Sequence, residues 1–420
     1  MTLGRLFRVT FLSAVLGLIW LLWPVYGFYS NQFETLRLPF GWADIPDASS
    51  SESELNNPSY KDAAEAAMDI LSHRRSEIGA PSLSAAISID GELVWAGAVG
   101  WRNVEKELPA TVDTTYRIGS TSKPVGITGL ARLVAEGKID LDEPISTYSS
   151  DLPNQAWNKF TARQLASHTA GLPGYEENDD WVGLYRSIAL RTRFSDPKTS
   201  LSMVDGASLQ FKPGDDFLYS GFDNILLSVI QQEIAGKTFN EHMANRVFAP
   251  LLMTSTVPDH IKVADIEQAT SYQAKGNRVK PWRSVDLSHK LAAGGYVSTP
   301  SNLARLGAAW LDDTFIPDVV RKEFWTPVEL NNGEVNEQNY ALGFRRNTAM
   351  IDGIGEITHL NHGGVSKGAQ CWLMIVPEHN IALAISTNRR TEAFFDFADV
   401  YVDLLEIFIP AKQRAESGSN

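Results

Sequence analysis

The sequence has one cysteine and a deficit of basic residues, and these two scarcities exclude several classes of protein. The single Cys371 rules out an intramolecular disulfide, and no group of Cys and His has the spacing of zinc ligands. The formal net charge of -13 argues against a nucleic-acid partner, because phosphate binding needs basic patches. We therefore expect no metal site, no cofactor and no nucleic-acid partner.

The bulk composition is that of an ordinary globular protein. Of the 420 residues, 44% are hydrophobic and 21% are charged, so a sizeable core can form. The length fits one large domain or two smaller ones.

The longest apolar run lies near the N-terminus. Arg5 and Arg8 precede a nearly unbroken apolar stretch from Val9 to Phe28, which is about long enough to cross a bilayer as a helix. The arginines predict that this end stays in the cytoplasm and that the rest of the chain lies on the other side. A cleaved signal peptide is the alternative, but the bulky aromatic residues at the end of the run favour an uncleaved anchor. We expect residues 1–30 to anchor the chain, by default in a bacterial inner membrane with the catalytic domain in the periplasm; a mitochondrial location is the alternative.

The remainder of the chain divides by composition. Residues 31–60 are polar and turn-rich, with little to bury, which predicts a tether. Apolar residues at helical spacing from Lys61 to Arg75 mark the start of the globular domain, which we place at 61–410. Residues 411–420 are expected to form a polar tail.

Strands are predicted at both ends of this domain and helices between them. The apolar runs Ser82–Ile89 and Leu93–Val99 are joined by an Asp-Gly pair, which is a strong hairpin signal. Gln370–Val376 and Ile381–Ser386 predict a second hairpin, and a last helix is expected over about 394–407. We predict an α/β (α+β) fold, in which both hairpins join one antiparallel sheet flanked by helices. The mid-chain helices would form an inserted lobe, with a site in the cleft between the lobes.

The segment Arg117–Pro124 contains the first candidate for chemistry, the pair Ser120 and Lys123. A serine hydroxyl needs a basic partner within hydrogen-bond reach before it can attack. If Ser120 opens a helix, Lys123 lies one turn later on the same face, where a desolvated amine can serve as that base. Gly119 permits close backbone approach, and the helix N-terminus offers N–H groups to an oxyanion. On these residues alone, an ordinary helix cap is the simpler interpretation.

Six further landmarks follow Ser120-x-x-Lys123 along the chain. They are Leu141–Ile145, Ser167–Pro173, Lys212–Gly214 leading to Tyr219, Pro250–Met253, Gly294–Thr299 and His362–Gly364. In this order, the seven resemble the class C beta-lactamase-like serine hydrolase superfamily, which is related to penicillin-binding proteins. That superfamily includes D-Ala-D-Ala carboxypeptidases, D-aminopeptidases, family VIII esterases and mitochondrial lactamase-like proteases. The resemblance covers about residues 62–409.

The resemblance implies a role for each matching residue. Ser120 would be the acylated nucleophile, and Lys123 would accept its proton or hold the base in place. Tyr219 would act as general base and later as acid, either as a phenolate or by relay with Lys123. His362 would donate a hydrogen bond toward Tyr219 or toward a substrate oxygen. The backbone N–H groups of Ser120 and Val365 would form the oxyanion hole.

Two departures from the lactamase pattern bear on the substrate. The second lactamase motif is Tyr-x-Asn, and here Gly221 stands where the substrate-contacting asparagine is expected. The third motif is His362-Gly363-Gly364 instead of Lys-Thr-Gly, and Gly364 would let the acyl group lie along the strand edge. Two of three motifs therefore point away from a beta-lactamase and toward the esterase or lactamase-like protease branch.

These observations predict a serine hydrolase that acts through an acyl-enzyme on a carboxylic ester or a small peptide amide. A beta-lactamase or a D-Ala-D-Ala carboxypeptidase is the first alternative, so the small-molecule partner is an ester, a peptide or a beta-lactam-like compound. A non-catalytic binding protein with the same fold is the second alternative. Intact Ser120, Lys123 and Tyr219 argue against it, because a binding protein does not need all three.

Overall fold

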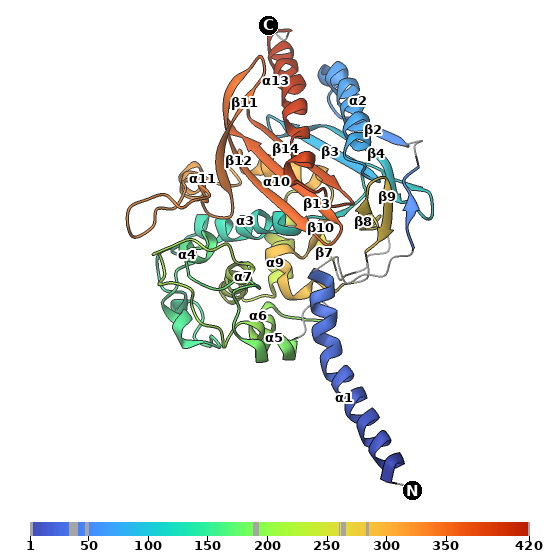
Figure 1. The fold of residues 1–420 in the computed structure, drawn as a ribbon. Helices are drawn as coiled ribbons and strands as arrows, with labels where there is room; N and C mark the ends of the chain where they lie inside the picture. The colour runs from blue at the N-terminus through green and yellow to red at the C-terminus, as the bar shows by residue number, and fades with distance from the viewer. Residues whose placement is uncertain are drawn as a thin grey trace.

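The fold is organised around one antiparallel sheet. The computed structural model describes residues 3–32, 41–46, 50–187, 193–259, 261, 266–282 and 285–418. Seven strands lie in the order β11-β12-β13-β14-β3-β4-β2, and the short β5 pairs with β4 (Figure 1). Their bounds are β2 (Ser51–Leu55), β3 (Ser82–Ile89), β4 (Glu92–Asn103), β5 (Leu108–Pro109), β11 (Arg345–Ile351), β12 (Gly355–Ser366), β13 (Ala369–Val376) and β14 (Ile381–Thr387).

Both predicted hairpins are present and share this sheet. Asp90 and Gly91 have φ angles of 52° and 85°, as a two-residue turn that matches the twist of its strands requires. The pairing of β14 with β3, for example Leu383 with Ile87, joins the second hairpin to the first. The strands β3, β13 and β14 are buried along their whole length, because helices cover both faces of the sheet.

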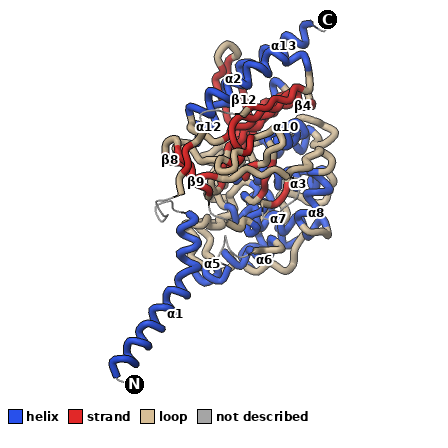
Figure 2. Tube along the Cα trace, turned by 90° about the vertical axis from the view of Figure 1, so that its right-hand side faces the viewer, coloured by secondary structure: helices blue, strands red, loops and turns tan. Residues whose placement is uncertain are grey.

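One face of the sheet carries α2 (Lys61–Glu77), α12 (Phe394–Ala398) and α13 (Val400–Gly418), and the opposite face carries α10 (Pro300–Ala309) (Figures 1 and 2). The alternation of side chains along the strands explains this division. In β3, Ile87 packs into the core under α2 and α13, whereas its neighbour Ala86 packs with Ala304 of α10.

A mainly helical lobe lies below the sheet in Figure 1 and holds the larger core. Its helix α7 (Gly221–Ala235) ends at Gly236, whose φ of 61° makes it a left-handed cap. The helices of the lobe are α3 (Ser122–Ala135), α4 (Ala162–Ala166), α5 (Trp181–Ser187), α6 (Pro197–Ser200), α7 (Gly221–Ala235), α8 (Phe239–Met243), α9 (Leu291–Gly294) and α11 (Asp318–Trp325).

Two small sheets complete the fold. The sheet of β6, β10 and β7 leads directly into the serine motif, because β6 ends two residues before Gly119. The other contains β1, β9 and β8. The bounds are β1 (Ala43–Asp44), β6 (Tyr116–Arg117), β7 (Val257–Pro258), β8 (Tyr272–Lys275), β9 (Arg278–Pro281) and β10 (Tyr296–Ser298).

The predicted domain limits need correction at both ends. Ser51–Leu55 was placed in the tether, but it forms β2 at the edge of the main sheet. The last helix was expected over about 394–407; it is instead two helices, α12 and α13, and the second runs through the predicted polar tail to Gly418. Residues 33–40 and 47–49 of the predicted tether lie outside the described residues.

The N-terminal segment forms the helix α1 (Leu3–Gln32), which projects away from the domain (Figures 1 and 2). Large apolar side chains such as Phe11 and Trp20 are exposed along it. Within the described part of the chain, no helix combines the length and the apolar character that crossing a membrane requires.

Candidate active site

Ser120 and Lys123 lie at the junction between a single 3-10 turn and α3. The turn covers Gly119–Thr121 and runs straight into α3 at Ser122. Gly119 has a φ of 52°, which an L side chain rarely adopts, so the chain can turn sharply just before the serine. The helical step then places Lys123 Nζ 3.4 Å from Ser120 Oγ, as the spacing of the two residues predicts.

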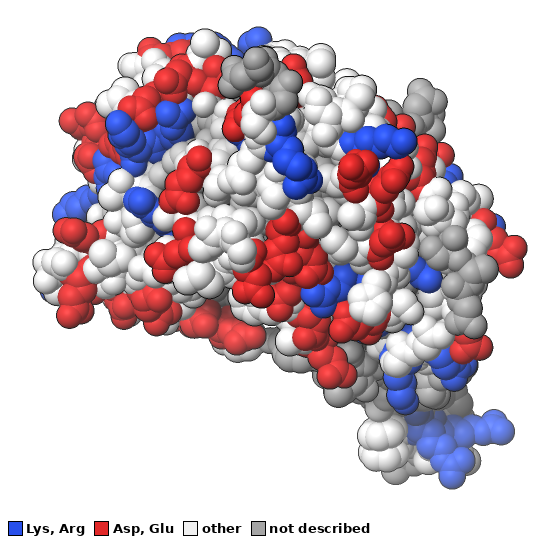
Figure 3. All heavy atoms as spheres, turned by 90° about the horizontal axis from the view of Figure 1, so that it is seen from above, with Lys and Arg blue, Asp and Glu red and all other residues white. Residues whose placement is uncertain are grey.

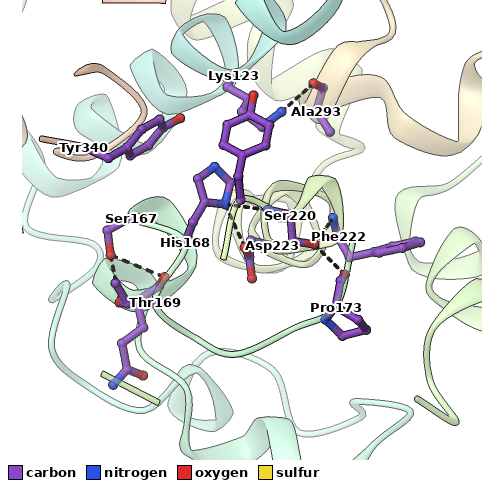
Figure 4. A network of polar contacts seen from close by, with 12 residues as sticks. Lys123, Ser167, His168, Thr169, Pro173, Ser220, Phe222, Asp223, Ala293 and Tyr340 are labelled. Atoms are coloured by element: carbon purple, nitrogen blue, oxygen red, sulfur yellow. Dashed lines mark hydrogen bonds and ion pairs between the residues drawn. The ribbon is translucent and has the colours of Figure 1, made fainter. Parts of the chain in front are cut away.

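Lys123 is almost completely buried, with 2% of its surface exposed. Its amino group donates to the carbonyl oxygen of Ala293 at 3.0 Å and lies 4.4 Å from the centre of the Tyr219 ring. Figure 4 shows the side chain pointing toward Ala293. A buried amine needs such partners, and these hold Nζ between the serine and the tyrosine.

The strand β12 lies unusually close to the serine turn, and two glycines permit this. A Cβ atom on Gly364 would stand 1.9 Å from the carbonyl oxygen of Ile118, and one on Gly119 would stand 2.6 Å from the carbonyl group of Val365. The hydroxyl of Thr121 also donates to the carbonyl oxygen of His362 at 3.1 Å. The structure thus brings the backbone of Val365 against that of the serine turn, which is the arrangement that an oxyanion hole needs.

Tyr219 is positioned by the start of α7. The next residue, Ser220, caps this helix: its Oγ accepts from the N–H of Phe222 at 3.1 Å and donates to the carbonyl of Pro173 at 2.7 Å. The same bonds appear in Figure 4. The cap fixes the backbone next to Tyr219, so the phenol reaches the cleft from the helical lobe.

His362 faces Tyr219 across the cleft, but the hydrogen-bond direction differs from our expectation. Its Nδ1 donates to the carbonyl of Gly363 at 2.8 Å. Burial, with smaller contributions from Arg345 and Lys123, holds the imidazole pKa well below 6.5, so the ring is neutral near pH 7. The proton is therefore on Nδ1, and Nε2 accepts a hydrogen bond instead of donating one. The distance from Nε2 to the Tyr219 hydroxyl is 3.5 Å.

Tyr340 and Arg345 belong to the site although the sequence analysis missed both. The Tyr340 hydroxyl lies 3.0 Å from His362 Nε2, and its pKa is raised mainly by burial, so it stays protonated and donates. The Arg345 guanidinium lies 5.4 Å from the centre of the Tyr219 ring and 5.1 Å from that of Tyr340. Neither residue belongs to one of the seven landmarks, and both reach the site only through tertiary packing.

His168 and Asp223 form a buried pair (Figure 4). His168 Nδ1 lies 2.7 Å from the Asp223 carboxyl group and 3.3 Å from the N–H of Ser220. Burial lowers the pKa of the imidazole and raises that of the carboxyl, so the pair is a neutral acid and a neutral ring. The His168 ring packs 4.5 Å from the Tyr219 ring, centre to centre. His168, with Asp223 as its partner, therefore acts as a structural residue that packs against Tyr219.

Ser120 and Tyr219 open onto a cleft of about 710 Å³ that also contains Arg345, Asn361, Gly363 and Val365 in its lining. Two predicted substrate-contacting residues, Gly221 and Gly364, are not in this lining. Gly364 is packed against the serine turn, and a Cβ on Gly221 would make only an ordinary contact with Ala293.

No group of His, Cys, Asp or Glu suited to a metal ion occurs among the residues that the structure describes. His359, which stands close to His362 in the sequence, bonds instead to the side chain of Asn361.

A family model and several known proteins match this chain. The family model described as Beta-lactamase matches residues 63–406. The serine beta-lactamase-like protein LACTB of Homo sapiens, a mitochondrial protein, is 26% identical over 401 residues; the match covers 75% of this chain and 72% of LACTB.

Solved structures show the same fold. D-amino acid amidase from Ochrobactrum anthropi superimposes with a TM-score of 0.67 at 24% sequence identity, covering 84% of this chain and 99% of that chain. The octameric penicillin-binding protein homologue from Pyrococcus abyssi gives a TM-score of 0.65 at 22% identity, covering 82% of this chain and 77% of that chain.

Proposed function

The chain belongs to the Beta-lactamase family of serine hydrolases, and from this premise we propose that it hydrolyses carboxylic esters or small peptide amides through an acyl-enzyme on Ser120. The observation that carries the proposal is the contact of Lys123 Nζ with Ser120 Oγ, 3.4 Å apart, where Ser120 lines an open cleft. A serine hydroxyl next to a buried amine is the arrangement that nucleophilic catalysis requires.

In the first half of the proposed reaction, Ser120 Oγ forms a bond to the substrate carbonyl carbon and its proton passes to Lys123. The negative charge on the carbonyl oxygen would be held by the N–H groups of Ser120 and Val365. The bond from carbon to the leaving oxygen or nitrogen then breaks. Tyr219, which lies against the Lys123 amine, gives that atom a proton and regains one from Lys123.

In the second half, a water molecule attacks the acyl carbon and passes its proton to the Tyr219 and Lys123 pair. The bond to Ser120 Oγ breaks, and the serine recovers its proton. His362 and Tyr340 hold Tyr219 in place in this scheme, because the neutral His362 ring accepts a bond from the Tyr340 hydroxyl and lies 3.5 Å from that of Tyr219.

The site residues favour esters and small amides over beta-lactams. The neutral His362 occupies the position where beta-lactamases carry a lysine, so the third motif brings no cation to a substrate carboxylate. Gly221, at the start of α7, has no side chain to bond a substrate amide. D-amino acid amidase, which shares the fold, has been crystallised with L-phenylalanine amide, and this supports amides among the candidate substrates.

Turnover of two chromogenic substrates tests the proposal. A short-chain p-nitrophenyl ester and a chromogenic cephalosporin are compared, with Ser120→Ala as the control. We expect ester hydrolysis that the variant abolishes, and little cephalosporin cleavage. Comparable cleavage of the cephalosporin would favour the beta-lactamase alternative, and unchanged ester hydrolysis in Ser120→Ala would contradict the proposal.

We also propose that α1 attaches the protein to a membrane surface. Support comes from its exposed apolar side chains, among which Phe7 and Trp20 are 74% and 78% exposed. Exposed apolar area of this extent is unfavourable in water and marks a site of interaction. A location on the non-cytoplasmic side of a bacterial inner membrane is part of the same proposal.

A further inference from the structure

The cleft extends beyond the catalytic residues into a second arm, which we call the aromatic arm. Four aromatic residues of the cleft lining define it: Trp372 of β13, Phe394 and Phe395 of α12, and Tyr401 of α13. Trp372 and Tyr401 belong to the core that packs against α2 and α13, whereas Tyr219 precedes α7 of the helical lobe, and one cleft contains all three residues in its lining. The proposed reaction uses none of the four.

The rings of the aromatic arm form one packed cluster around Trp372. Its ring centre lies 5.4 Å from that of Phe394, 6.3 Å from that of Phe395 and 6.1 Å from that of Tyr401. Trp372 and Tyr401 are nearly parallel, with 15° between their planes. Phe395 is 59% exposed, which leaves it free to contact a molecule in the cleft.

Gly363 connects the arm to the catalytic residues. It stands between His362 and Gly364 on β12 and lines the cleft. A Cβ atom here would lie 2.6 Å from the tip of the Phe394 ring and 3.2 Å from Trp372. The missing side chain therefore lets the aromatic cluster come directly against β12, two residues before Val365.

The rest of the lining beside the aromatic cluster is polar but uncharged, and the His359 ring lies 6.0 Å from that of Tyr401, centre to centre. Asn347, His359 and Asn361 belong to it, and the Asn361 amide donates to the Asn347 side chain at 2.9 Å. Burial lowers the pKa of His359 to about 4, so its ring is neutral near pH 7. The two charged residues in the whole cleft lining, Glu337 and Arg345, have opposite signs. The walls thus match a group that is flat, apolar and without net charge.

We propose that the aromatic arm binds an uncharged aromatic group of the substrate, and so makes aryl-bearing esters or amides the preferred substrate class of the Ser120 site. This inference rests on the proposed hydrolase function. The occupant is the substrate itself, because the arm and the nucleophile share one cavity.

Three esters of similar intrinsic reactivity test the inference: ethyl acetate, benzyl acetate and ethyl phenylacetate. The two aryl esters place the ring on the alcohol side and on the acyl side of the scissile bond. We expect kcat/KM for one of them to exceed that for ethyl acetate by about tenfold or more, since burying a ring of this size contributes enough free energy for such a ratio.

Phe395→Ala is the decisive variant, because this exposed side chain can be removed without opening the core. It should reduce kcat/KM for the preferred aryl ester by about three- to tenfold through KM, and reduce kcat/KM for ethyl acetate by a smaller factor. Trp181→Ala is the matched control, since Trp181 is 65% exposed and is not in the cleft lining; it should leave the preference intact. An aryl preference that Phe395→Ala does not change would overturn the inference.

A binding measurement tests the aromatic arm independently of the proposed hydrolase activity. Titration of benzyl acetate into full-length Ser120→Ala protein, with and without Phe395→Ala, reports on the arm when no reaction occurs. Weaker binding in the double variant supports the arm even if turnover fails, whereas equal binding contradicts it. Absence of ester turnover by the wild-type protein would count against the hydrolase proposal alone.

Discussion

Lys123 is the residue on which the proposed chemistry most depends. Its amine is buried, and among the described residues its polar contacts are a serine hydroxyl, a backbone carbonyl and an aromatic face. No carboxylate of the described chain lies within ion-pair distance of it; the lysines Lys198 and Lys412, in contrast, pair with aspartates. This isolation leaves Nζ available to exchange protons with Ser120 and Tyr219.

Replacing Lys123 by methionine removes the amine but keeps a flexible stem of similar length. We expect kcat to fall by roughly 10² to 10⁴-fold, the usual contribution of a positioned acid or base, while the protein stays folded. Steady-state kinetics on the p-nitrophenyl ester and thermal unfolding measure the two effects. Activity within a few-fold of the wild type would remove Lys123 from the mechanism.

Buried histidines predict a loss of stability in mild acid. Burial lowers the pKa values of His242 and His359 to about 4, and those of His168, His289 and His362 also fall below 6.5. Between about pH 4 and 6.5 the unfolded chain therefore binds more protons than the folded one. In this window the free energy of unfolding must therefore decrease as the pH is lowered, by up to about 1.4 kcal/mol per pH unit for each histidine.

The raised pKa values of Asp223 and Asp399 act in the opposite direction, but these are two groups against the five histidines. Urea unfolding at pH 7, 6 and 5 measures the effect. His359→Gln, which keeps a polar group next to Asn361, should reduce the slope below pH 6.5. A free energy of unfolding that stays constant from pH 7 to pH 5 would contradict the assignment of these rings as neutral.

At the residue scale, the sequence predicts the site as far as its motifs extend. Ser120 and Lys123 are recognisable because helical geometry alone sets their distance. Tyr340 and Arg345 contact Tyr219 or His362 from a segment with no motif, so only the folded chain shows them. The sequence also could not predict the direction of the His362 hydrogen bond, because this direction depends on the carbonyl to which Nδ1 donates in the folded chain.

The contact between β12 and the serine turn is the central feature at the scale of elements. It aligns the Val365 backbone with Ser120, and it exists because Gly364 and Gly119 have no side chains. The obstacle to a larger residue at position 364 is the backbone of Ile118, which cannot move aside as a flexible side chain could.

Gly364→Ala should therefore separate β12 from the turn. We expect the overpacking to lower the free energy of unfolding by about 1–3 kcal/mol. We expect a larger proportional loss in kcat, because the oxyanion site widens. Gly126→Ala in α3 is the matched control, since its Cβ would make only ordinary contacts, the nearest at 3.5 Å, and alanine favours helix. Chemical denaturation and ester kinetics on both variants measure the difference, and equal behaviour of the two would refute this account of the contact.

Elements with a local signal were predicted, and those without one were not. The Asp90-Gly91 turn and the long apolar runs identify β3, β4, β13 and β14. The edge strand β2 has only exposed residues and a polar sequence, so nothing local distinguishes it from a tether.

At the scale of the whole molecule, the acidic balance is distributed over the surface instead of being concentrated in the cleft. The face seen in Figure 3 carries several patches of Asp and Glu with Lys and Arg interspersed among them. The cleft contains one acidic and one basic residue in its lining, besides the buried Lys123. The net charge therefore favours solubility of the domain. Substrate specificity depends instead on the shape and polarity of the cleft.

Removal of residues 1–32 tests the proposed role of α1. The helix meets the domain through the bond from the Tyr185 hydroxyl to the carbonyl of Leu21, at 3.1 Å, and β2 remains in the shortened chain. We expect the shortened protein to keep its ester kinetics and thermal midpoint. The full chain should sediment with lipid vesicles and the shortened one should stay in the supernatant. Equal sedimentation of both would contradict membrane attachment through α1.

The most direct test of acyl transfer through Ser120 is covalent labelling of the folded, full-length protein with a fluorophosphonate, followed by mass spectrometry of the peptides. The account predicts one adduct per chain, on Ser120, and a large drop in labelling rate in Lys123→Met because the hydroxyl loses its basic partner. No adduct in the folded protein, or an adduct on another serine that survives in Ser120→Ala, would contradict the central claim.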